Sequence, residues 1–360
     1  MTGVKDGYEP AHPAGDGRSD TRVTIHDVAA GAGVSVATVS RVLNSHPDVS
    51  ADTRNAVLRY ARELGYVGRR AASPAPRPRR QTRLFAVAVP DLRSEYAAEI
   101  MTGANDALSD RDARLVISSV GNSRVPLAGR LMTDTTDGAL LILPEGNLDD
   151  VSELQATGYP LVAVEPLVSL PLAIPAVSAT SWAGARAATE YLIELGHTHI
   201  GLISGPEEWQ ISQDRVAGYQ AALLTAGLPL VPHLRRSSDL SVADGKRAAL
   251  ELLSRPHVPS AILALGTAIA VGVLQAAQQR DLSVPSDLSV ITFDDLAIAS
   301  ISTPPLTAVR QPLLGEGRVA ADMLYRLVEG QPLDARRIEL STEFVVRGST
   351  APPHGASFLT

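Results

Sequence analysis

The chain of 360 residues contains no cysteine, and only 4% of its residues are aromatic. Without cysteine there is no disulfide framework, no thiolate-ligated metal site and no thiol nucleophile. No apolar run is long enough to cross a bilayer, and residues 1–20 carry four acidic residues and none of the apolar character of a secretory signal. These absences predict a soluble, cytoplasmic protein with no membrane partner.

The sequence also lacks the motifs of common catalytic sites. Its one Gly-Lys pair, at residues 245–246, has leucine where a phosphate-binding loop needs its first glycine. Neither a G-x-S-x-G elbow nor an H-E-x-x-H helix is present. No third histidine lies near His197 and His199, so hydrogen-bonded turn histidines are a simpler interpretation than a metal site. The sequence predicts a protein that is not an enzyme and uses no cofactor or metal.

Charge of both signs is present but unevenly distributed. The chain as a whole has a net charge of −7 at pH 7. Residues 21–83 hold eleven arginines and four acidic residues, whereas acidic residues are in excess over residues 84–360. A small basic segment joined to a large acidic body indicates a module that binds a polyanion such as nucleic acid.

Length and patterning divide the chain into five parts. Residues 1–20, rich in Gly, Pro and Asp, are predicted to be a disordered leader. Residues 21–67 have helical periodicity, and residues 68–83 form an Arg- and Pro-rich linker. Residues 84–350 alternate short apolar runs with amphipathic stretches, and residues 351–360 are predicted to be a disordered tail.

The alternation from residue 84 onward predicts an α/β fold. Seven runs rich in Val, Ile and Leu have strand length: 84–89, 114–118, 139–143, 161–164, 199–204, 261–264 and 288–293. Amphipathic stretches between them predict helices at 95–109, 183–195, 213–226, 242–253 and 268–279. Such repetition implies doubly wound parallel sheets with ligands at the carboxyl ends of the strands. About ten strand candidates favour two sheets over one.

The basic N-terminal segment has the pattern of three short helices. Thr24, Ser35 and Ser50 can cap their first turns, and Gly31 or Gly33 ends the first helix. The second and third helices are predicted over residues 36–43 and 51–64. Three short helices with a glycine turn between the first two follow the helix-turn-helix plan, although a generic helical bundle has the same pattern.

Longer motifs carry a resemblance to a known family. The basic segment contains VTIHDVAAGAGVSVATVSRVLN at 23–44, VSADTR at 49–54 and LGY at 64–66. The remainder contains ELGH at 194–197, ISGP at 203–206, RVAGY at 215–219, FDD at 293–295 and TPPLTAVRQ at 303–311. From residue 22 to about 348 the chain resembles the lactose-repressor (LacI) family of bacterial transcription factors. The resemblance implies a helix-turn-helix head and a two-lobed core like that of periplasmic sugar-binding proteins. It also implies a homodimer in which a bound small molecule alters the geometry of the dimer and its affinity for a pseudo-palindromic DNA operator.

The resemblance places the second helix in the major groove. Val39, Val42 and Leu43 face the core of the head, so the outward Val36, Ala37 and Arg41 are predicted at base edges. The Arg41 guanidinium can pair with guanine O6 and N7, whereas the two small side chains read shape or a thymine methyl. The remaining predicted DNA contacts, mostly to phosphates, are Thr24, Ser35, Thr38, Ser40, Asn44, Thr53, Arg54, Arg69 and Arg70. A helix cap alone for Ser35, and a solvated face for the arginines of the third helix, remain open alternatives.

The linker departs from the family pattern. Most members have Pro-Asn where this chain has Gly68-Arg69, and a leucine that wedges into the minor groove where it has Pro74-Ala75. Proline breaks a helix, and alanine is a poor wedge. The linker arginines are therefore predicted to hold phosphates or the minor groove in place of a leucine. Whether the linker forms a hinge helix remains open.

The effector site is predicted, through the resemblance, at Tyr96, Arg215, Thr267 and Asp294. Arg215 and Asp294 match the cleft Arg and Asp that hold polar groups of the ligand, and such a pair suits the hydroxyls of a carbohydrate. A structural ion pair that only closes the cleft is the alternative.

Three family positions around this site differ. Gly266-Thr267 replaces Asn-Asp, Thr180-Ser181 replaces Asp-Asn, and Ser94-Glu95-Tyr96-Ala97 replaces Asn-Pro-Phe-Phe. The pocket has thereby lost carboxylates and one aromatic ring. Tyr96 can stack on a ligand, and Trp182 or Trp209 can line the opening. These changes predict weaker or differently shaped recognition than in sugar-binding relatives.

Three functions follow from these observations. The first is a DNA-binding repressor whose operator affinity responds to a small molecule, in particular a sugar. The second is the same regulator with a degenerate pocket, controlled by a partner protein or by its own concentration. The third is a sugar-binding protein without a DNA function. The basic head and the missing signal peptide argue against the third.

Overall fold

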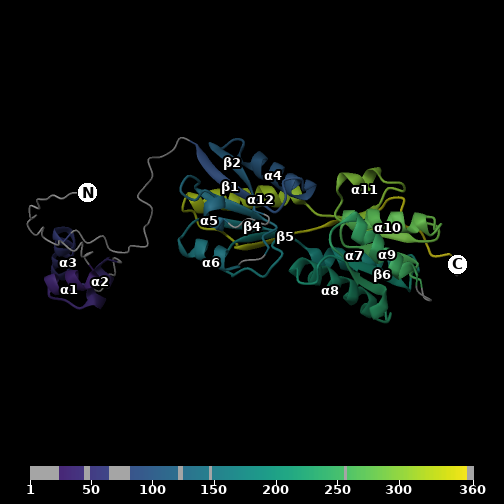
Figure 1. The fold of residues 1–360 in the computed structure, drawn as a ribbon, viewed down its shortest axis with the longest axis horizontal. Helices are drawn as coiled ribbons and strands as arrows, with labels where there is room; N and C mark the ends of the chain where they lie inside the picture. Colours follow the sequence, from purple (N-terminus) through teal and green to yellow (C-terminus); the bar gives the residue numbers. More distant parts are fainter. Residues whose placement is uncertain are drawn as a thin grey trace, which may run out of the picture. The chain divides into compact units, whose positions relative to one another are not determined.

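The structure, a computed structural model, describes residues 24–43, 49–64, 82–120, 125–145, 148–254 and 258–354. The chain divides into two compact units, Met1–Pro78 and Arg79–Thr360, and the division falls inside the predicted linker. The first unit holds three helices, α1 (Ile25–Ala32), α2 (Val36–Leu43) and α3 (Ala51–Glu63). The second holds two α/β lobes (Figure 1).

Side-chain caps begin the helices of the first unit, as predicted. The Thr38 backbone N–H donates to Ser35 Oγ at 3.1 Å ahead of α2, and the Thr53 N–H donates to Ser50 Oγ at 3.3 Å ahead of α3. Buried apolar residues from all three helices form one small core: Val28, Ala29, Val39, Val42, Val57 and Ala61. The predicted helix-turn-helix arrangement is confirmed.

The two glycines near the end of α1 have different structural roles. Gly33 follows the helix in the left-handed region, at φ 66°, and is the glycine that ends it. Gly31 lies inside α1, where a Cβ would stand 2.9 Å from a ring carbon of Tyr60 on α3.

At the other end of α1, the Asp27 carboxylate accepts hydrogen bonds from the Thr24 N–H at 2.7 Å and the Thr24 hydroxyl at 2.8 Å.

Each lobe of the second unit is built on a six-stranded sheet. The N-terminal lobe has the parallel order β11 (Arg337–Leu340), β5 (Ala176–Ala179), β4 (Leu161–Val164), β3 (Gly138–Ile142), β1 (Arg83–Val89), β2 (Ala113–Ser119). The C-terminal lobe has the order β12 (Glu343–Val345), β10 (Thr307–Arg310), β9 (Ser289–Phe293), β8 (Ala261–Ala264), β6 (Ile200–Ser204), β7 (Arg235–Ser237). Only the pairing of β12 with β10 is antiparallel in these two sheets. The predicted pair of doubly wound sheets and all seven predicted strands are confirmed.

Helices cover both faces of the sheets. The five predicted ones are α4 (Glu95–Leu108), α7 (Ser181–Glu194), α8 (Gln210–Thr225), α9 (Val242–Leu253) and α10 (Thr267–Gln279). Four more were not predicted as helices or only by a first turn: α5 (Leu127–Arg130), α6 (Leu148–Ala156), α11 (Ala297–Ile301) and α12 (Leu313–Val328). Among the described residues, no helix is both long and apolar enough to cross a membrane.

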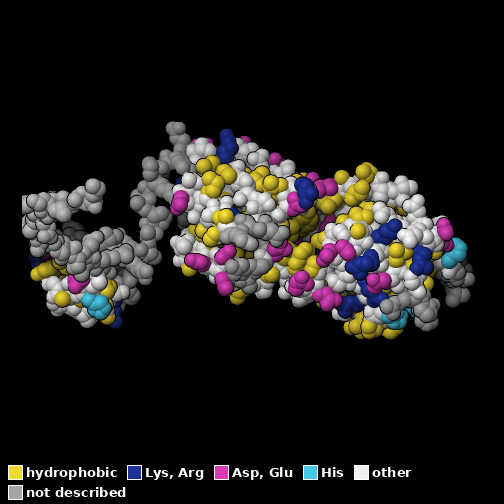
Figure 2. All heavy atoms as spheres, viewed as in Figure 1, with side chains coloured by type: hydrophobic (Ala, Val, Ile, Leu, Met, Phe, Trp, Pro, Cys, Tyr) yellow, Lys and Arg dark blue, Asp and Glu magenta, His cyan; other side chains and the backbone are white. Residues whose placement is uncertain are grey.

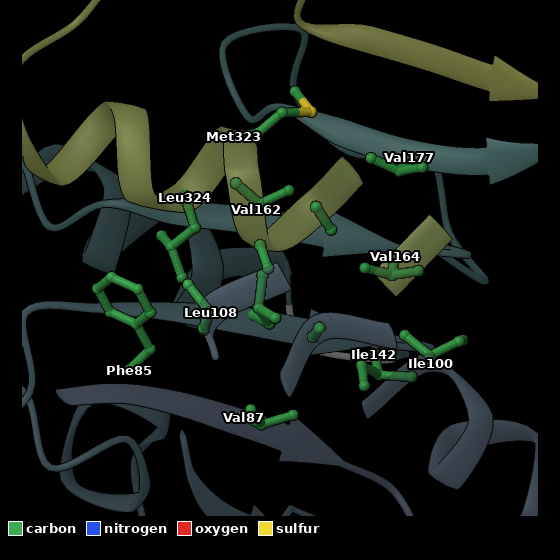
Figure 3. Packing of buried hydrophobic residues seen from close by; sticks show 14 of the residues in the cluster. Phe85, Val87, Ile100, Leu108, Ile142, Val162, Val164, Val177, Met323 and Leu324 are labelled. Carbon is green, nitrogen blue, oxygen red and sulfur yellow. The ribbon is translucent and has the colours of Figure 1, made fainter. Parts of the chain in front are cut away.

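Helix α12 closes the core of the N-terminal lobe, although it lies far along the chain from the strands it covers. In Figure 3, Met323 and Leu324 of α12 pack with Leu108 of α4 over Phe85 of β1 and Val162 of β4. The packing of α12 against α4 therefore joins a late segment of the chain to the first helix of this lobe.

The chain crosses between the lobes three times: from β5 into α7, from β10 into α12 and from β11 into β12. Two of these crossings are bonded together. The Thr180 N–H donates to the Leu340 carbonyl at 2.9 Å, and the Thr342 N–H donates to Thr180 Oγ1 at 3.2 Å. The triple crossing sets the carboxyl ends of strands from both sheets against each other, which is where α/β sheets bind ligands.

Two predicted boundaries differ by one residue or more. Arg83, assigned to the linker, is the first residue of β1. Ala351, assigned to the disordered tail, belongs to the core, because its N–H donates to Ser289 Oγ at 3.0 Å and its carbonyl contacts His197 Nε2 at 2.9 Å. His197 also contacts Ser260 Oγ at 2.8 Å, so it is the hydrogen-bonded turn histidine that the sequence indicated.

Candidate functional site

A cavity of about 480 Å³ lies between the two lobes. Residues that follow strands of both sheets line it: Pro90 and Leu143 after β1 and β3, and Gly205, Gly266 and Asp294 after β6, β8 and β9. The four predicted effector residues, Tyr96, Arg215, Thr267 and Asp294, all lie on its lining. The structure therefore brings together side chains that are almost 200 residues apart in the chain.

Arg215 is held in place on three sides. Helix α8 begins at Gln210, three residues earlier than predicted, so Arg215 lies in its second turn and not at its start. The guanidinium carbon stands 3.7 Å from the centre of the Phe293 ring. Nε donates to Ser181 Oγ and Nη1 to the Leu265 carbonyl, both at 3.3 Å. With only 7% of its side chain exposed, Arg215 presents a rigid donor to the cavity.

Asp294 follows β9 in the left-handed region, at φ 71°. Its Oδ1 lies 3.7 Å from Arg215 Nη2 and accepts a hydrogen bond from Gln311 Nε2. Its backbone carbonyl accepts from the Thr267 hydroxyl at 2.9 Å. Burial raises the pKa of Asp294, while the Arg215 charge and the Gln311 amide act in the opposite direction. At 3.7 Å the two groups are an ion pair without a direct hydrogen bond.

Tyr96 and Gln311 extend this polar group into the N-terminal lobe. The Tyr96 hydroxyl, at the start of α4, donates to Gln311 Oε1 at 3.3 Å. Gln311 lies on the crossing from β10 to α12, so it connects a residue of one lobe with Asp294 of the other. The pKa of the Tyr96 phenol is raised well above its ordinary value by burial and by nearby carboxylates.

Two buried acids beside this group were not predicted. Glu165 follows β4, is 2% exposed and accepts a hydrogen bond from the Ala179 N–H. Glu316, in the first turn of α12, is fully buried, and neither of its carboxylate oxygens has a hydrogen-bond partner among the described residues. Burial raises the pKa of Glu165 to about 7. Burial, together with the negative charges of Glu165 and Asp294, raises the pKa of Glu316 to about 9. The cluster therefore holds protons at neutral pH.

Only part of this cluster left a signal in the sequence. Glu165 directly follows a predicted strand and Gln311 ends a family motif, so both positions carried a signal, although neither residue was predicted as part of the site. Glu316 follows Leu313 and Leu314 in a stretch that has ordinary amphipathic character. Nothing local distinguishes it from a solvent-exposed acid.

The two tryptophans have different positions. Trp209 lines the cavity, as one of the two predicted alternatives. Trp182 does not: it is 42% exposed, and its ring lies 5.4 Å from the Arg186 guanidinium on the same helix. Only Trp209 is placed to contact a ligand in this cavity.

The first unit presents its predicted DNA face on α2. Ala37 and Arg41 are exposed one helical turn apart. Val36, predicted to face outward, is half-buried and packs partly against the core of the head, because it begins the helix beside α1. Thr38 and Ser40 are half-buried. The exposed surface of α2 thus centres on Arg41.

The predicted phosphate contacts take local hydrogen bonds in this structure. Ser35 Oγ and Thr38 Oγ1 lie 2.9 Å apart, and Thr53 Oγ1 accepts from Ser50 Oγ at 2.9 Å. Ser35 is therefore a helix cap, which leaves its exposed face open to a phosphate. Arg54 is half-buried on α3. Asn44, Arg69 and Arg70 lie outside the described residues.

Comparison with known proteins agrees with this architecture. Residues 24–68 match "Bacterial regulatory proteins, lacI family", and residues 189–350 match "Periplasmic binding protein-like domain". The HTH-type transcriptional repressor CytR of Escherichia coli (strain K12) is 32% identical over 342 residues, covering 92% of this chain and 98% of that protein.

Two solved structures show the same fold over nearly the whole chain. The transcriptional regulator CelR–cellobiose complex is 33% identical, with a TM-score of 0.70, and covers 91% of this chain and all of that one. The lac repressor dimer bound to operator and the anti-inducer ONPF is 28% identical, with a TM-score of 0.67, and covers 92% of this chain and all of that one. With its three-helix head, its two lobes and a relative at 32% identity along almost its full length, the chain belongs to the lacI family of bacterial regulatory proteins.

Proposed function

We propose that this chain is a repressor that binds a pseudo-palindromic operator as a homodimer, and that a small molecule in the cavity between the lobes alters its operator affinity. The observation that carries the proposal is the convergence of Tyr96, Arg215, Thr267 and Asp294 on one cavity in a chain with a DNA-binding head. The proposed head is residues 21–67, the proposed linker is residues 68–82, and the proposed effector-binding core runs from Arg83 to Ala351. The proposal places the protein in the cytoplasm with its operator and assigns it no catalytic step.

A carbohydrate-like ligand suits the polar end of the cavity. Arg215 offers donors held at a fixed angle, and the Asp294 carboxylate accepts from hydroxyl groups. The similar CelR structure holds cellobiose, which supports a hydroxylated ligand. Gln311 is hydrogen-bonded to both Asp294 and Tyr96. A ligand bound at Asp294 can therefore affect the segment between β10 and α12, which connects the two lobes.

The ligand changes operator affinity only if it binds one arrangement of the lobes more tightly than the other. The cavity supplies that difference, because its lining comes from both lobes and can surround a ligand fully only when they are close. By linkage, operator DNA then changes ligand affinity by the same factor.

The test combines operator mapping with ligand titration. Protected DNA sites are mapped upstream of the chain's own gene and its neighbours, and affinity for the protected sequence is measured with and without cellobiose, ribose and other sugars. A symmetric footprint and an affinity that changes with ligand in the wild type but not in Arg215→Met support the proposal. A footprint whose affinity no ligand alters favours the effector-independent regulator, and no specific footprint overturns the DNA function.

A further inference from the structure

We propose that three buried acids, Glu165, Asp294 and Glu316, form a pH-sensitive switch. Protons bound to this acid cluster keep the two lobes together, and their loss separates the lobes. Operator affinity then depends on pH as well as on the small molecule. The inference rests on the proposed function for this effect on the operator, whereas the arrangement of the lobes can be measured without DNA.

Glu316 is the member of the acid cluster with the least compensation for a negative charge. It lies in the first turn of α12, directly after the segment that crosses between the lobes. Its side chain is fully buried, and neither carboxylate oxygen has a hydrogen-bond partner in the part of the chain that the structure describes. A Cβ at Gly317 would stand 1.9 Å from the Ile100 carbonyl oxygen of α4, so α12 cannot rotate Glu316 into water without losing this packing. Protonation removes the charge without moving the helix.

Groups on several elements act on Glu316. Besides Glu165 after β4 and Asp294 after β9, these are the Tyr96 phenol of α4 and the Arg215 guanidinium of α8. Strands β3 and β5, which α12 also contacts, carry no titratable side chain. Burial raises the pKa of Glu165 and of Glu316, and the Asp294 charge adds to both increases.

Glu165 connects the acid cluster with the space between the lobes. It lines a second cavity, of about 640 Å³, whose lining comes from both lobes and includes Asp214 of α8 and Arg337 of β11. Its carboxylate accepts from the N–H of Ala179, the last residue of β5, after which the chain crosses into α7. Glu165 and Glu316 therefore adjoin different crossings, so a change of charge on either acts on a connection between the lobes.

The acid cluster contains members from both lobes. Glu165 and Glu316 belong to the N-terminal lobe, and Asp294 belongs to the C-terminal lobe together with Arg215. On the face shown in Figure 2, hydrophobic side chains gather where the two lobes meet, so a closed junction excludes water. When the lobes separate, Asp294 and Arg215 leave as an ion pair whose charges largely offset, and the main change at the two glutamates is the entry of water, which favours ionisation. The closed arrangement thus binds more protons than an open one, and protons favour it by linkage.

Single hydrogen bonds join the lobes across the first cavity. The Gln210 N–H donates to the Leu167 carbonyl at 2.9 Å, and the Ala297 N–H donates to Glu95 Oε1 at 2.8 Å. Each such bond changes an equilibrium by about ten-fold or less. One proton changes it by up to about ten-fold per pH unit. Proton loss from the acid cluster therefore has the magnitude needed to separate the lobes.

The first experiment observes the lobes through tryptophan fluorescence. The chain has two tryptophans: Trp209 lines the first cavity next to the hydrogen bond of Gln210, and Trp182 is exposed on α7. In the full chain carrying Trp182→Phe, without DNA or sugar, we expect Trp209 emission to shift to longer wavelength between about pH 6.5 and about pH 9, with unchanged far-UV circular dichroism. An emission that is constant over this range overturns the switch.

Variants assign the shift to the acid cluster. Glu316→Gln keeps the shape of the neutral acid, and Glu316→Met replaces it with an apolar side chain of similar length, so the test does not depend on one variant alone. Both should remove most of the shift, and Glu165→Gln should remove the part at lower pH. The control Glu153→Gln, which changes an exposed acid of α6, should keep the wild-type shift. A shift that persists in both Glu316 variants overturns the assignment.

The second experiment measures operator binding. Affinity for the mapped operator should change by about three-fold or more per pH unit between about pH 7 and about pH 9, and Glu316→Gln should reduce this dependence by at least about half. The sign of the change identifies the arrangement that binds DNA. Titratable groups of the head act equally in both proteins, so an equal dependence in the two proteins overturns the control of operator affinity by the acid cluster.

Failure of this inference differs from failure of the proposed function. Operator affinity that responds to sugars but has the same pH dependence in wild type and Glu316→Gln overturns the switch alone. A Trp209 shift that both Glu316 variants abolish, in a protein with no specific footprint, supports the switch and overturns the DNA function.

Discussion

Glu316 is the residue whose environment departs furthest from that of an ordinary acid. It is fully buried, and its carboxylate oxygens have no hydrogen-bond partner among the described residues. The charged groups that act on it are Glu165 and Asp294, which are negative, and Arg215, which is positive, and the same groups act on the Tyr96 phenol. One guanidinium cannot balance three buried carboxylates, so the folded protein keeps Glu316 protonated at neutral pH.

Stability should therefore fall as the pH rises. The folded-state pKa of Glu316 is about 9, against 4.5 for the unfolded chain, so the folded state binds more protons within that window. The free energy of unfolding then decreases by up to about 1.4 kcal/mol per pH unit for this group. Glu165, with a pKa of about 7, adds to the decrease below pH 7. Glu316→Gln keeps the shape of the side chain but cannot ionise. The variant should therefore show a flatter dependence of stability on pH and be more stable than wild type at pH 8.5.

Urea unfolding between pH 5 and pH 9 measures this dependence. The matched control is Glu153→Gln, which changes an exposed acid on α6 and should keep the wild-type slope. A slope identical in wild type and Glu316→Gln would contradict the assigned protonation of Glu316.

At the DNA, one residue should carry most of the polar base recognition. Arg41 is the exposed cation on α2, with small or half-buried neighbours. Arg41→Ala should weaken operator binding by about 1–3 kcal/mol and relax discrimination at one base pair of each half-site. The control Arg59→Ala removes an arginine of α3 that is 64% exposed and pairs with Glu63 at 3.9 Å, and should have little effect. Anisotropy titrations with single-base operator variants distinguish the outcomes, since equal weakening on every sequence would make Arg41 a phosphate contact.

At the scale of elements, glycine lets the covering helices meet backbone to backbone. On α12, a Cβ at Gly317 would stand 1.9 Å from the Ile100 carbonyl oxygen of α4. The same arrangement occurs between α7 and α8, where a Cβ at Gly218 would stand 2.2 Å from the Trp182 carbonyl oxygen. In the pair α9 and α10, a Cβ at Gly272 would stand 2.4 Å from the Lys246 backbone nitrogen. The spacing of these helices is thus determined at single residues.

Gly317→Ala should destabilise the protein by about 1–3 kcal/mol or more, because the methyl group forces α12 away from α4. Gly315→Ala, two residues earlier on the same helix, meets its nearest atom at 3.5 Å, an ordinary contact, and should be neutral or slightly stabilising. Chemical denaturation of both variants tests the contrast. If the two substitutions have the same effect, the loss comes from helix propensity or the unfolded chain and not from the packing of α12 on α4.

At the scale of the whole molecule, charge separates the DNA-binding end from the body. The eleven arginines of residues 21–83 belong to a chain that is otherwise acidic. DNA binding by such an end releases counterions, so affinity should fall steeply with salt. The acidic body should oppose nonspecific attachment of the remaining surface to DNA.

The linker contribution can be measured from charge alone. Replacing Arg77, Arg79 and Arg80 by glutamine should flatten the slope of log affinity against log salt by about 0.9 for each phosphate that the linker no longer neutralises. Operator titrations at salt concentrations from about 50 to 300 mM provide the slope. The control is Arg111→Gln, in the body of the chain. An unchanged slope would mean that the linker does not touch the DNA.

Local physics made a large part of the fold predictable. Strands β3, β4 and β8 are buried on both faces and therefore appear in the sequence as continuous apolar runs. Five strands were not predicted. Strands β7, β11 and β12 are short, lie at sheet edges and keep polar residues partly exposed. Strands β5 and β10 lie inside their sheets but have only four residues each, and Ser178, Thr307 and Arg310 interrupt their apolar runs. Helix α12 was missed because its burial comes from strands and a helix that lie much earlier in the chain.

By itself, the sequence determined the helix caps of the head, the two parallel sheets and the family, since each depends on side chains close together in the chain or on motifs at fixed spacing. The family motifs also pointed to Arg215 and Asp294. Only the tertiary structure decided that Glu165, Asp294 and Glu316 share one buried cluster. These groups meet because the chain crosses three times between the lobes, and no local periodicity records which distant segments a crossing brings together.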